Sequence, residues 1–143
     1  MQFDIQPMTI EDYQETAALW MNTPGIGLHA DSDAEDKIAD YLKRNPGLSF
    51  VAKSEGHIIG AVLCGHDGRR GYLNHLAVDV KYRSHGIGRA LTDACLAALK
   101  SSGISKCNIM VFADNSDGYD FWCKTCWTEY PGLILMQKPT SQD

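Results

Sequence analysis

Hydrophobic and polar residues alternate along this chain with two different periods. A period of two is typical of strands, and apolar residues spaced three and four apart are typical of helices. Strands are predicted at residues 3–6, 48–52, 57–65, 72–80, 107–111 and 133–138, and helices at residues 10–21, 34–44, 87–103 and 117–125. The predicted order is therefore β-α-α-β-β-β-α-β-α-β.

Capping and turn signals agree with these boundaries. Thr9 is a good N-cap for the first helix, and Asn45-Pro46-Gly47 ends the second. Residues 53–56 form a tight turn between two strand patterns, which predicts a hairpin. Hairpins give antiparallel pairs and a helical crossover gives a parallel one. The predicted fold is one α/β domain over residues 1–143, with a mixed, mostly antiparallel sheet flanked by helices.

Composition narrows the class of protein. Apolar residues make up 44% of the 143 residues and charged residues 22%, which is normal for a globular domain. The net charge of −5 leaves no basic footprint, so no nucleic-acid partner is expected. There is no apolar run of membrane-spanning length and no signal peptide, so a cytoplasmic protein is expected. Its five cysteines are then expected to be reduced thiols.

Two glycines stand where the third helix begins, although glycine costs a helix roughly 1 kcal/mol relative to alanine. A strand, a glycine-containing loop and a helix N-terminus together form a common anion site, because the first helical amides have no partner inside the helix. A tight turn without a ligand is the alternative. The spacing fits neither a Walker loop nor a dinucleotide-binding fingerprint, since Arg89-Ala90 follows Gly88 and Leu91 replaces the third glycine.

The spacing does fit R-x-x-G-x-G, from Arg83 to Gly88, preceded by the strand residues LAV. A second segment, NSDGYDFWCKTCW at residues 115–127, is similar to an N-x-x-A-x-x-F-Y-x-x-x-G-[FWY] helix. In both segments, and in its order of elements, the chain resembles the GNAT superfamily of acetyl-coenzyme A-dependent N-acetyltransferases. The resemblance implies acetyl-CoA as cosubstrate, an amine as acceptor and direct attack without an acyl-enzyme.

The resemblance also implies roles for particular residues. Backbone amides of the loop are expected to bind the pyrophosphate of CoA, and the backbone of the LAV strand to pair with its pantetheine arm. An amide near Leu76 or Val78 would polarise the thioester carbonyl. Asn115 matches an asparagine that contacts the cofactor arm. The expected cofactor-binding residues are Leu76, Ala77, Val78, Arg83, Ser84, His85, Gly86, Ile87, Gly88, Arg89, Asn115 and Trp122. For Arg89, a solvated surface arginine is an equal alternative.

This sequence departs from the family at the acid and at the base. Trp122 stands where the family has a tyrosine that protonates the thiolate, and an indole donates no proton at useful pH. Tyr119, one turn earlier, is the candidate replacement, with solvent as the alternative. The family's base matches Tyr72 or Asn74, neither of which is a strong base, so a water held by them is proposed. His75 has the right chemistry for a base, but strand alternation places it on the opposite face, together with Leu73 and Ala77, where a buried histidine with satisfied hydrogen bonds is favoured over a catalytic one.

Two other features have simpler explanations beside the chemical ones. Cys123 and Cys126 form a CxxC pair, which is typical of redox sites or half of a zinc site. No second pair or histidine pair accompanies it, so no metal is expected and packing in a helix explains it. The acidic run at residues 31–36 would attract a cationic amine, or simply start a helix.

The sequence therefore predicts an N-acetyltransferase, with a non-catalytic acyl-CoA-binding or regulatory domain as the alternative and a thiol redox protein as a third. The acceptor is left open among amino acids, polyamines, antibiotics, peptide N-termini and lysine side chains. The expected partners are acetyl-CoA and a small-molecule or peptide amine. A homodimer is one alternative for the oligomeric state.

Overall fold

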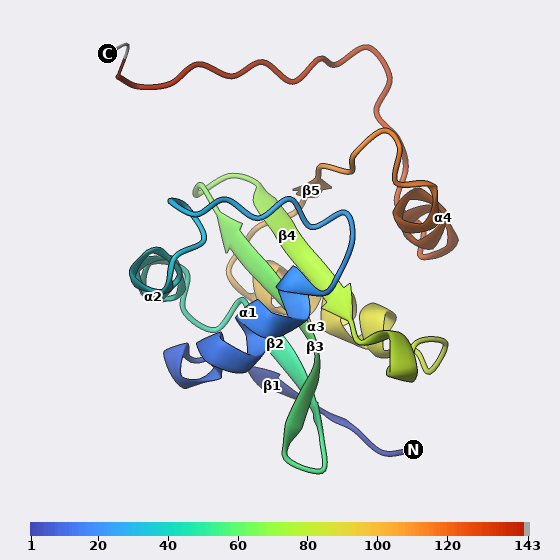
Figure 1. Ribbon diagram of the computed structural model, residues 1–143. Coiled ribbons are helices and arrows are strands. Elements are labelled where there is room, and N and C mark those ends of the chain that lie inside the picture. The colour runs from blue at the N-terminus through green and yellow to red at the C-terminus, as the bar shows by residue number, and fades with distance from the viewer. Residues whose placement is uncertain (142–143) are drawn as a thin grey trace. The chain divides into compact units, whose positions relative to one another are not determined.

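The computed structural model describes residues 1–141 of the chain (Figure 1). Its elements are the strands β1 (Asp4–Pro7), β2 (Phe50–Ser54), β3 (His57–His66), β4 (Gly71–Val78) and β5 (Cys107–Ile109), the helices α1 (Tyr13–Met21), α2 (Glu35–Arg44), α3 (Ile87–Ser101) and α4 (Ser116–Lys124), and the short 3-10 turns η1 (Ile10–Asp12) and η2 (Val80–Tyr82). The chain divides into two compact units, one up to Phe112 and one from Ala113 onward.

The first unit contains a five-stranded mixed sheet in the order β1-β2-β3-β4-β5. Neighbouring strands are antiparallel except β4 and β5, which are parallel. The parallel pair follows from the α3 crossover, because a helix between two strands returns the chain in the same direction. The mixed, mostly antiparallel sheet and the α/β class predicted from the sequence are confirmed.

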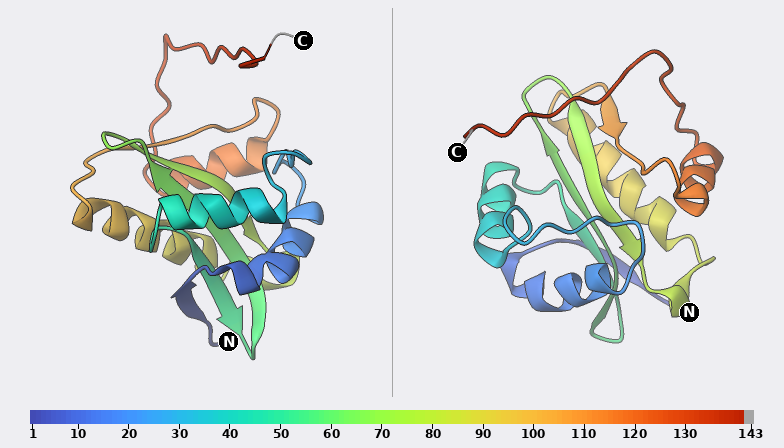
Figure 2. Two further views of the ribbon diagram at one scale, coloured as in Figure 1. Left: turned by 90° about the vertical axis from the view of Figure 1, so that its left-hand side faces the viewer. Right: turned by 45° about the horizontal axis from the view of Figure 1, so that its top comes forward.

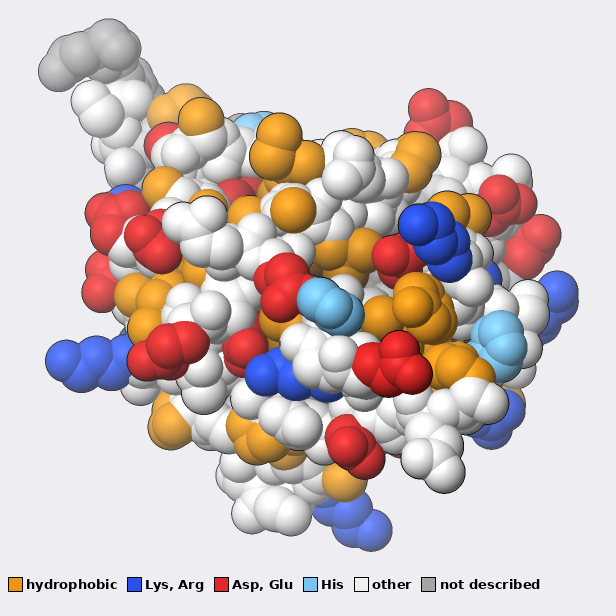
Figure 3. Space-filling view, turned by 60° about the horizontal axis from the view of Figure 1, so that its bottom comes forward, with side chains coloured by type: hydrophobic (Ala, Val, Ile, Leu, Met, Phe, Trp, Pro, Cys, Tyr) orange, Lys and Arg blue, Asp and Glu red, His pale blue; other side chains and the backbone are white. Residues whose placement is uncertain are grey.

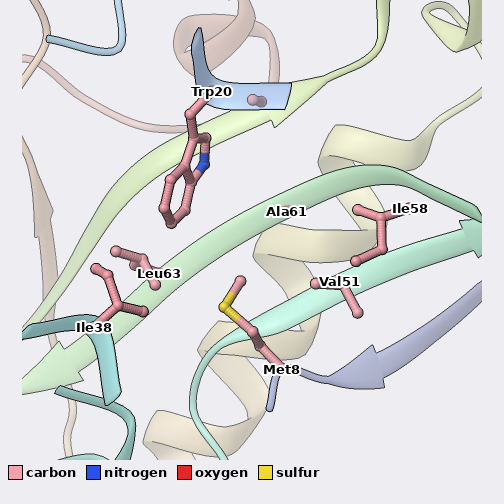
Figure 4. Close-up of a cluster of buried hydrophobic side chains, with 8 residues drawn as sticks. Met8, Trp20, Ile38, Val51, Ile58, Ala61 and Leu63 are labelled. Atoms are coloured by element: carbon pink, nitrogen blue, oxygen red, sulfur yellow. The ribbon is translucent and has the colours of Figure 1, made fainter. Parts of the chain in front are cut away.

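Helices cover both faces of this sheet. Figure 2 shows α1 and α2 on one face and α3 on the other. On the first face, a cluster of buried side chains joins Trp20 of α1 and Ile38 of α2 to the middle strands (Figure 4). Trp20 is 1% exposed and is among the largest fully buried side chains. Burial of such side chains typically stabilises a fold by about 1.5–3 kcal/mol each.

The turns form as their sequences predict. Glu55 and Gly56 join β2 to β3 with φ angles of 51° and 79°, the positive values that favour a two-residue hairpin matching the strand twist. The amide of Thr9 donates to the carboxylate of Asp12 at 3.0 Å, which holds the chain at the start of the first helical region. Local sequence therefore fixes where these elements begin.

The last predicted strand is not formed. Residues 133–138 have no strand structure, and Leu133, Ile134, Leu135 and Met136 are 65–85% exposed. The prediction was wrong because an apolar run becomes a strand only where another strand accepts its backbone hydrogen bonds, and the described residues provide none there. The observed order ends with α4. That the whole chain is one domain stays a prediction.

Surface charge is mixed. The face shown in Figure 3 carries acidic and basic side chains next to one another, with hydrophobic side chains between them. No helix within residues 1–141 combines the length and the apolar character needed to cross a membrane.

Candidate functional site

The loop between β4 and α3 is exposed from Arg83 to Gly86 and ends at the start of a helix. Gly86 is the N-cap of α3 and has a φ of 79°, and Ser84 also has a positive φ of 66°. The first hydrogen bond inside the helix runs from the Ala90 amide to the Gly86 carbonyl at 3.0 Å. The amides of Ile87 and Gly88 therefore precede the helical ladder, where an anion is the favoured partner.

Cationic side chains lie close to these amides in the sequence. Arg83 and Arg89 are both exposed. The Nε atom of Arg83 donates to the Val78 carbonyl at 3.1 Å, which fixes the base of the guanidinium at the end of β4. His85 is also exposed, and its Nδ1 lies 2.9 Å from the Arg83 carbonyl, so it braces the loop from within. The loop combines free amides, a helix N-terminus and two arginines, which suits a phosphate ligand.

Gly60 allows the first turn of α3 to sit directly on the sheet. A Cβ atom at this position would lie 3.0 Å from both Ile87 Cγ2 and Leu91 Cδ1. Both side chains are fully buried, at 1% and 0% exposure. Gly71 plays the same part at the far end of the helix, where a Cβ would come within 2.5 Å of Leu99. Close packing on β3 and β4 thus sets the height of the helix N-terminus above the sheet.

β4 and β5 pair over only part of their length. Gly71, Tyr72 and Leu73 pair with Cys107, Asn108 and Ile109, and β5 then ends. In the part of the chain that the structure describes, no strand pairs with residues 74–78 on that side of β4. The backbone polar groups along this edge are available to an extended ligand, since unpaired strand edges readily accept another chain of hydrogen bonds.

β4 contains a bulge in the middle of this free edge. Asn74 pairs with Leu63 and Ala77 pairs with Ala61, so His75 and Leu76 together lie opposite Val62. His75 has a φ of 56°, in the left-handed region that non-glycine residues seldom adopt. Such an insertion reverses the alternation of side chains along the strand.

The bulge overturns the predicted distribution of side chains between the two faces. Ala77 joins the buried cluster that includes Trp20 and Ile38, on the face covered by α1 and α2. Tyr72 pairs with Gly65, where an added Cβ would meet Tyr41 of α2, so Tyr72 shares that face. The prediction that His75 points away from Tyr72 and Asn74 was wrong, because regular alternation was assumed where one residue is inserted.

His75 instead contacts the elements that cover this face. Its Nε2 lies 2.9 Å from Oδ1 of Asp33, and the side chains of the pair are only 15% and 13% exposed. The His75 ring packs edge-on against the Trp20 indole, with ring centroids 5.1 Å apart. The indole Nε1 also donates to the His75 carbonyl at 2.9 Å, which holds the bulge in place. The sequence pointed to Asp33 only as a member of the acidic run at residues 31–36 and did not point to Trp20, and no sequence signal pairs either residue with His75.

Asp33 also organises the loop between α1 and α2. Its Oδ2 accepts from the His29 amide at 2.8 Å, and its carbonyl accepts from the Tyr13 hydroxyl at 2.8 Å. Burial and then the nearby carboxylates of Glu35, Asp33 and Asp36 raise the pKa of Tyr13, which therefore remains a neutral donor.

The same loop reaches the residues that follow β5. A Cβ on Gly27 would lie 2.8 Å from the Phe112 ring. A hollow of about 300 Å³ adjoins the loop and is lined by Trp20, Ile26 and Leu28, among others. A second hollow of about 330 Å³ lies between α1 and η2 and is lined by Leu19, Val80 and Arg83, among others.

The comparison with protein families decides what this architecture is. Residues 13–126 match the model of the acetyltransferase (GNAT) family. The chain belongs to the GNAT family. The match includes the free edge of β4, the loop before α3, and helix α4. It confirms the family and the enzyme class predicted from the sequence, an N-acetyltransferase.

Curated relatives carry the same class of name. The chain is 36% identical over 105 residues to acetyltransferase YPTB2753 of Yersinia pseudotuberculosis, covering 73% of each protein. It is 29% identical over 140 residues to acetyltransferase SG1711 of Sodalis glossinidius, covering 98% of this chain and 97% of the relative. The first of these acetyltransferases thus aligns with about three quarters of the chain and the second with nearly all of it.

Solved structures show the same fold. AAC(6')-Iy in complex with the bisubstrate analogue CoA-S-monomethyl-acetylneamine superposes with a TM-score of 0.79, at 17% identity, over 97% of this chain and 99% of that one. The PaiA N-acetyltransferase of Thermoplasma acidophilum, in complex with coenzyme A, has a TM-score of 0.76 at 21% identity, over 87% and 88% of the two chains. At these identities the likeness shows the GNAT fold.

The remaining predicted site residues lie in the second unit. Asn115 caps α4, its Oδ1 accepting from the Gly118 amide at 3.0 Å. The Tyr119 hydroxyl donates to Glu129 at 3.0 Å, and hydrogen bonds with Cys123 and Glu129 raise its pKa to about 12. Trp122 packs edge-on against two other aromatic rings, Phe121 and Trp127, each 5.1 Å away. The predicted roles of Asn115, Tyr119 and Trp122 in a GNAT site stay predictions.

The cysteines are free thiols in two settings. Cys123 and Cys126 are exposed, whereas Cys64 and Cys95 are buried between the sheet and α3. A hydrogen bond with Cys64, together with burial, raises the pKa of the Cys95 thiol. Burial raises the pKa of the Cys107 thiol to about 12. Within residues 1–141 no group of three or more His, Cys, Asp or Glu side chains is arranged to hold a metal ion.

Proposed function

We propose that this GNAT protein transfers the acetyl group of acetyl-CoA to a primary amine by direct attack. The observation that carries the proposal is the free edge of β4, at residues 74–78, which leads straight into the glycine loop at the start of α3. An extended pantetheine arm pairs with the edge, and the pyrophosphate at its end binds the loop amides. Both parts of one ligand thus find their partners along a single stretch of backbone.

The residues divide the work by position. The amides from Arg83 to Gly88 hold the pyrophosphate, and Arg89 adds a charge-assisted contact to phosphate. The backbone of Leu76, Ala77 and Val78 binds the arm. An amide near Leu76 or Val78 stabilises the oxyanion that forms as the amine attacks, a contribution that such donors make in many acyl transfers.

Gly86 offers a test with a matched control on the same helix. Gly86 and Gly103 have φ angles of 79° and 83°, and at both positions an added Cβ would have no other atom within 4 Å. Replacing either by alanine costs about 1–2 kcal/mol of strain, because alanine resists the left-handed region. Gly86→Ala should also weaken CoA binding by about tenfold, and Gly86→Val and Gly88→Val by more, while Gly103→Ala should leave the affinity unchanged.

Calorimetry measures the CoA affinity of each variant, and thermal unfolding measures the strain. Equal CoA affinity in the two alanine variants would remove the loop from the site. Free thiol released from acetyl-CoA in the presence of amino acids, polyamines, aminoglycosides and peptides then reports transfer. Tight CoA binding without thiol release from any acceptor would favour the non-catalytic acyl-CoA-binding alternative.

A further inference from the structure

We propose that His75, oriented by Asp33, accepts the proton that the incoming amine loses. The proposal rests on the acetyl transfer proposed above. It names the general base, a role to which that reaction has no residue assigned. Neither Tyr72 nor Asn74, the residues at the family's usual position, is a strong base. Histidine is the side chain whose ordinary titration falls nearest to neutral pH.

The first support is the position of His75 on the strand. It occupies the bulge in the free edge of β4, between Asn74 and Ala77. The acyl end of acetyl-CoA would lie along this part of the strand. The inserted residue turns the His75 side chain toward α1 and the loop before α2. The left-handed φ of 56° is a strained conformation, and strain of this kind is often found at functional sites.

The second support is the state of the imidazole ring. Asp33 accepts from Nε2 at 2.9 Å, so the neutral ring carries its hydrogen there and leaves the lone pair on Nδ1. Among residues 1–141 no hydrogen-bond partner is found for Nδ1, and Thr16 Oγ1 is the one buried side-chain polar atom without a partner. Nδ1 therefore reaches the surface, where it can receive a proton.

The third support is the space next to the pair. The Trp20 indole that packs on the His75 ring also lines the hollow of about 300 Å³ beside the loop of residues 25–28. A pocket of this size accommodates a small ligand. An amine entering the hollow would approach the bulge from the side on which His75 lies.

The groups around the ring and Asp33 come from the loop, α1, the start of α2 and β3. The loop contributes Asp33 directly and His29 through its amide on Asp33. α1 contributes the Tyr13 hydroxyl, which donates to the Asp33 carbonyl, and Glu35 and Asp36 at the start of α2 lie near that hydroxyl. From β3, the residues opposite the bulge are the apolar Val62 and its neighbour Leu63. The charged groups near the ring and its partner Asp33 are therefore mostly carboxylates.

The chemical step balances without another reactant. The amine nitrogen forms a bond to the thioester carbon, and its proton passes to Nδ1 of His75. The bond from carbon to sulfur then breaks, and the CoA thiolate takes a proton from solvent. His75 returns its proton to solvent, which leaves the N-acetylated amine and free CoA.

The test compares pH profiles of kcat at saturating amine for the wild type, His75→Gln and Asp33→Asn. His57→Gln is the matched control, because this exposed histidine also has a carboxylate neighbour, Glu15 at 3.8 Å, but lies at the start of β3, outside the bulge of β4. We expect His75→Gln to lose about 10²–10³-fold in kcat, the usual contribution of a positioned base. The acidic limb of the wild-type profile should disappear with it. Asp33→Asn should lower kcat less and displace that limb, and His57→Gln should match the wild type.

Calorimetric CoA affinity and near-ultraviolet circular dichroism show whether each variant is folded. His75→Asn is the second variant if His75→Gln is unstable, since asparagine tolerates a left-handed φ. A raised KM with kcat and the acidic limb unchanged would mean that His75 only holds the loop, and would overturn the proposal. Wild-type protein that binds CoA but acetylates no amine would overturn the proposed function, and this inference with it.

Discussion

The packing of α3 against the sheet sets the position of the helix N-terminus in the proposed CoA site. A substitution at Gly60 tests this dependence. A Cβ at Gly60 would lie 3.0 Å from Ile87 Cγ2 and Leu91 Cδ1, so the first turn of α3 must move by a few tenths of an ångström in Gly60→Ala. Overpacking of this kind typically costs about 1–3 kcal/mol. The lower chain entropy of unfolded alanine offsets about 0.4–1 kcal/mol of that cost.

The expected loss of stability is therefore about 1–2 kcal/mol for Gly60→Ala. The same movement lifts the helical amides that precede Ala90. A hydrogen bond to a charged group contributes about 1.5–3 kcal/mol, so weakening one such bond should raise the CoA dissociation constant by about tenfold.

Gly71→Ala provides the contrast at the other end of α3. Its Cβ would come within 2.5 Å of Leu99 Cδ1, so this variant is destabilised at least as much. Because Leu99 lies three turns from the loop, CoA affinity should stay within about twofold of the wild type. Urea unfolding and calorimetry on the two variants measure both quantities. Equal CoA affinities in the two variants, or a larger loss of affinity in Gly71→Ala, would refute the reasoning that the position of the α3 N-terminus on the sheet determines CoA affinity.

Two further predictions concern the thiols and α4. With Ellman's reagent at pH 8, Cys123 and Cys126 should react first, since both are exposed, and Cys107 should react slowly. The reaction rate of Cys107 should rise about tenfold per pH unit toward its raised pKa of about 12. A fast reaction of Cys107 at pH 7 would contradict the burial that raises this pKa. Trp122→Phe should change single-turnover acetyl transfer little, and Trp122→Tyr should leave it unchanged or raise it. A loss of about 10²–10⁴-fold in Tyr119→Phe would instead make Tyr119 the general acid.

Much of the fold could be predicted because its signals are local. The hairpin at Glu55–Gly56, the end of α2 near Asn45 and the helical period after Gly86 each depend on a few adjacent residues. Their boundaries agree with the structure to within one or two residues. The loop before α3 could be predicted for the same reason, because its glycines and Arg83 are contiguous.

The errors arose where structure depends on distant partners. Residues 133–138 have the apolar pattern of a buried strand, but nothing in that pattern says whether another strand is available. The bulge at His75 depends on how β4 registers with β3 and on the hydrogen bond from Trp20, 55 residues away in the chain. Asp33 reaches His75 across 42 residues, so no spacing rule could pair them.

The inserted residue divides β4 into two halves in which the alternation of side chains between the two faces of the sheet is opposite. In the half before His75, even-numbered residues such as Tyr72 and Asn74 face α1 and α2, whereas beyond His75 and Leu76 it is odd-numbered Ala77 that does so. A deletion of Leu76 would restore a single parity and rotate every later position of the strand to the other face. The arrangement of this edge thus depends on how many residues lie between Asn74 and Val78, a property that substitutions preserve and a one-codon deletion destroys.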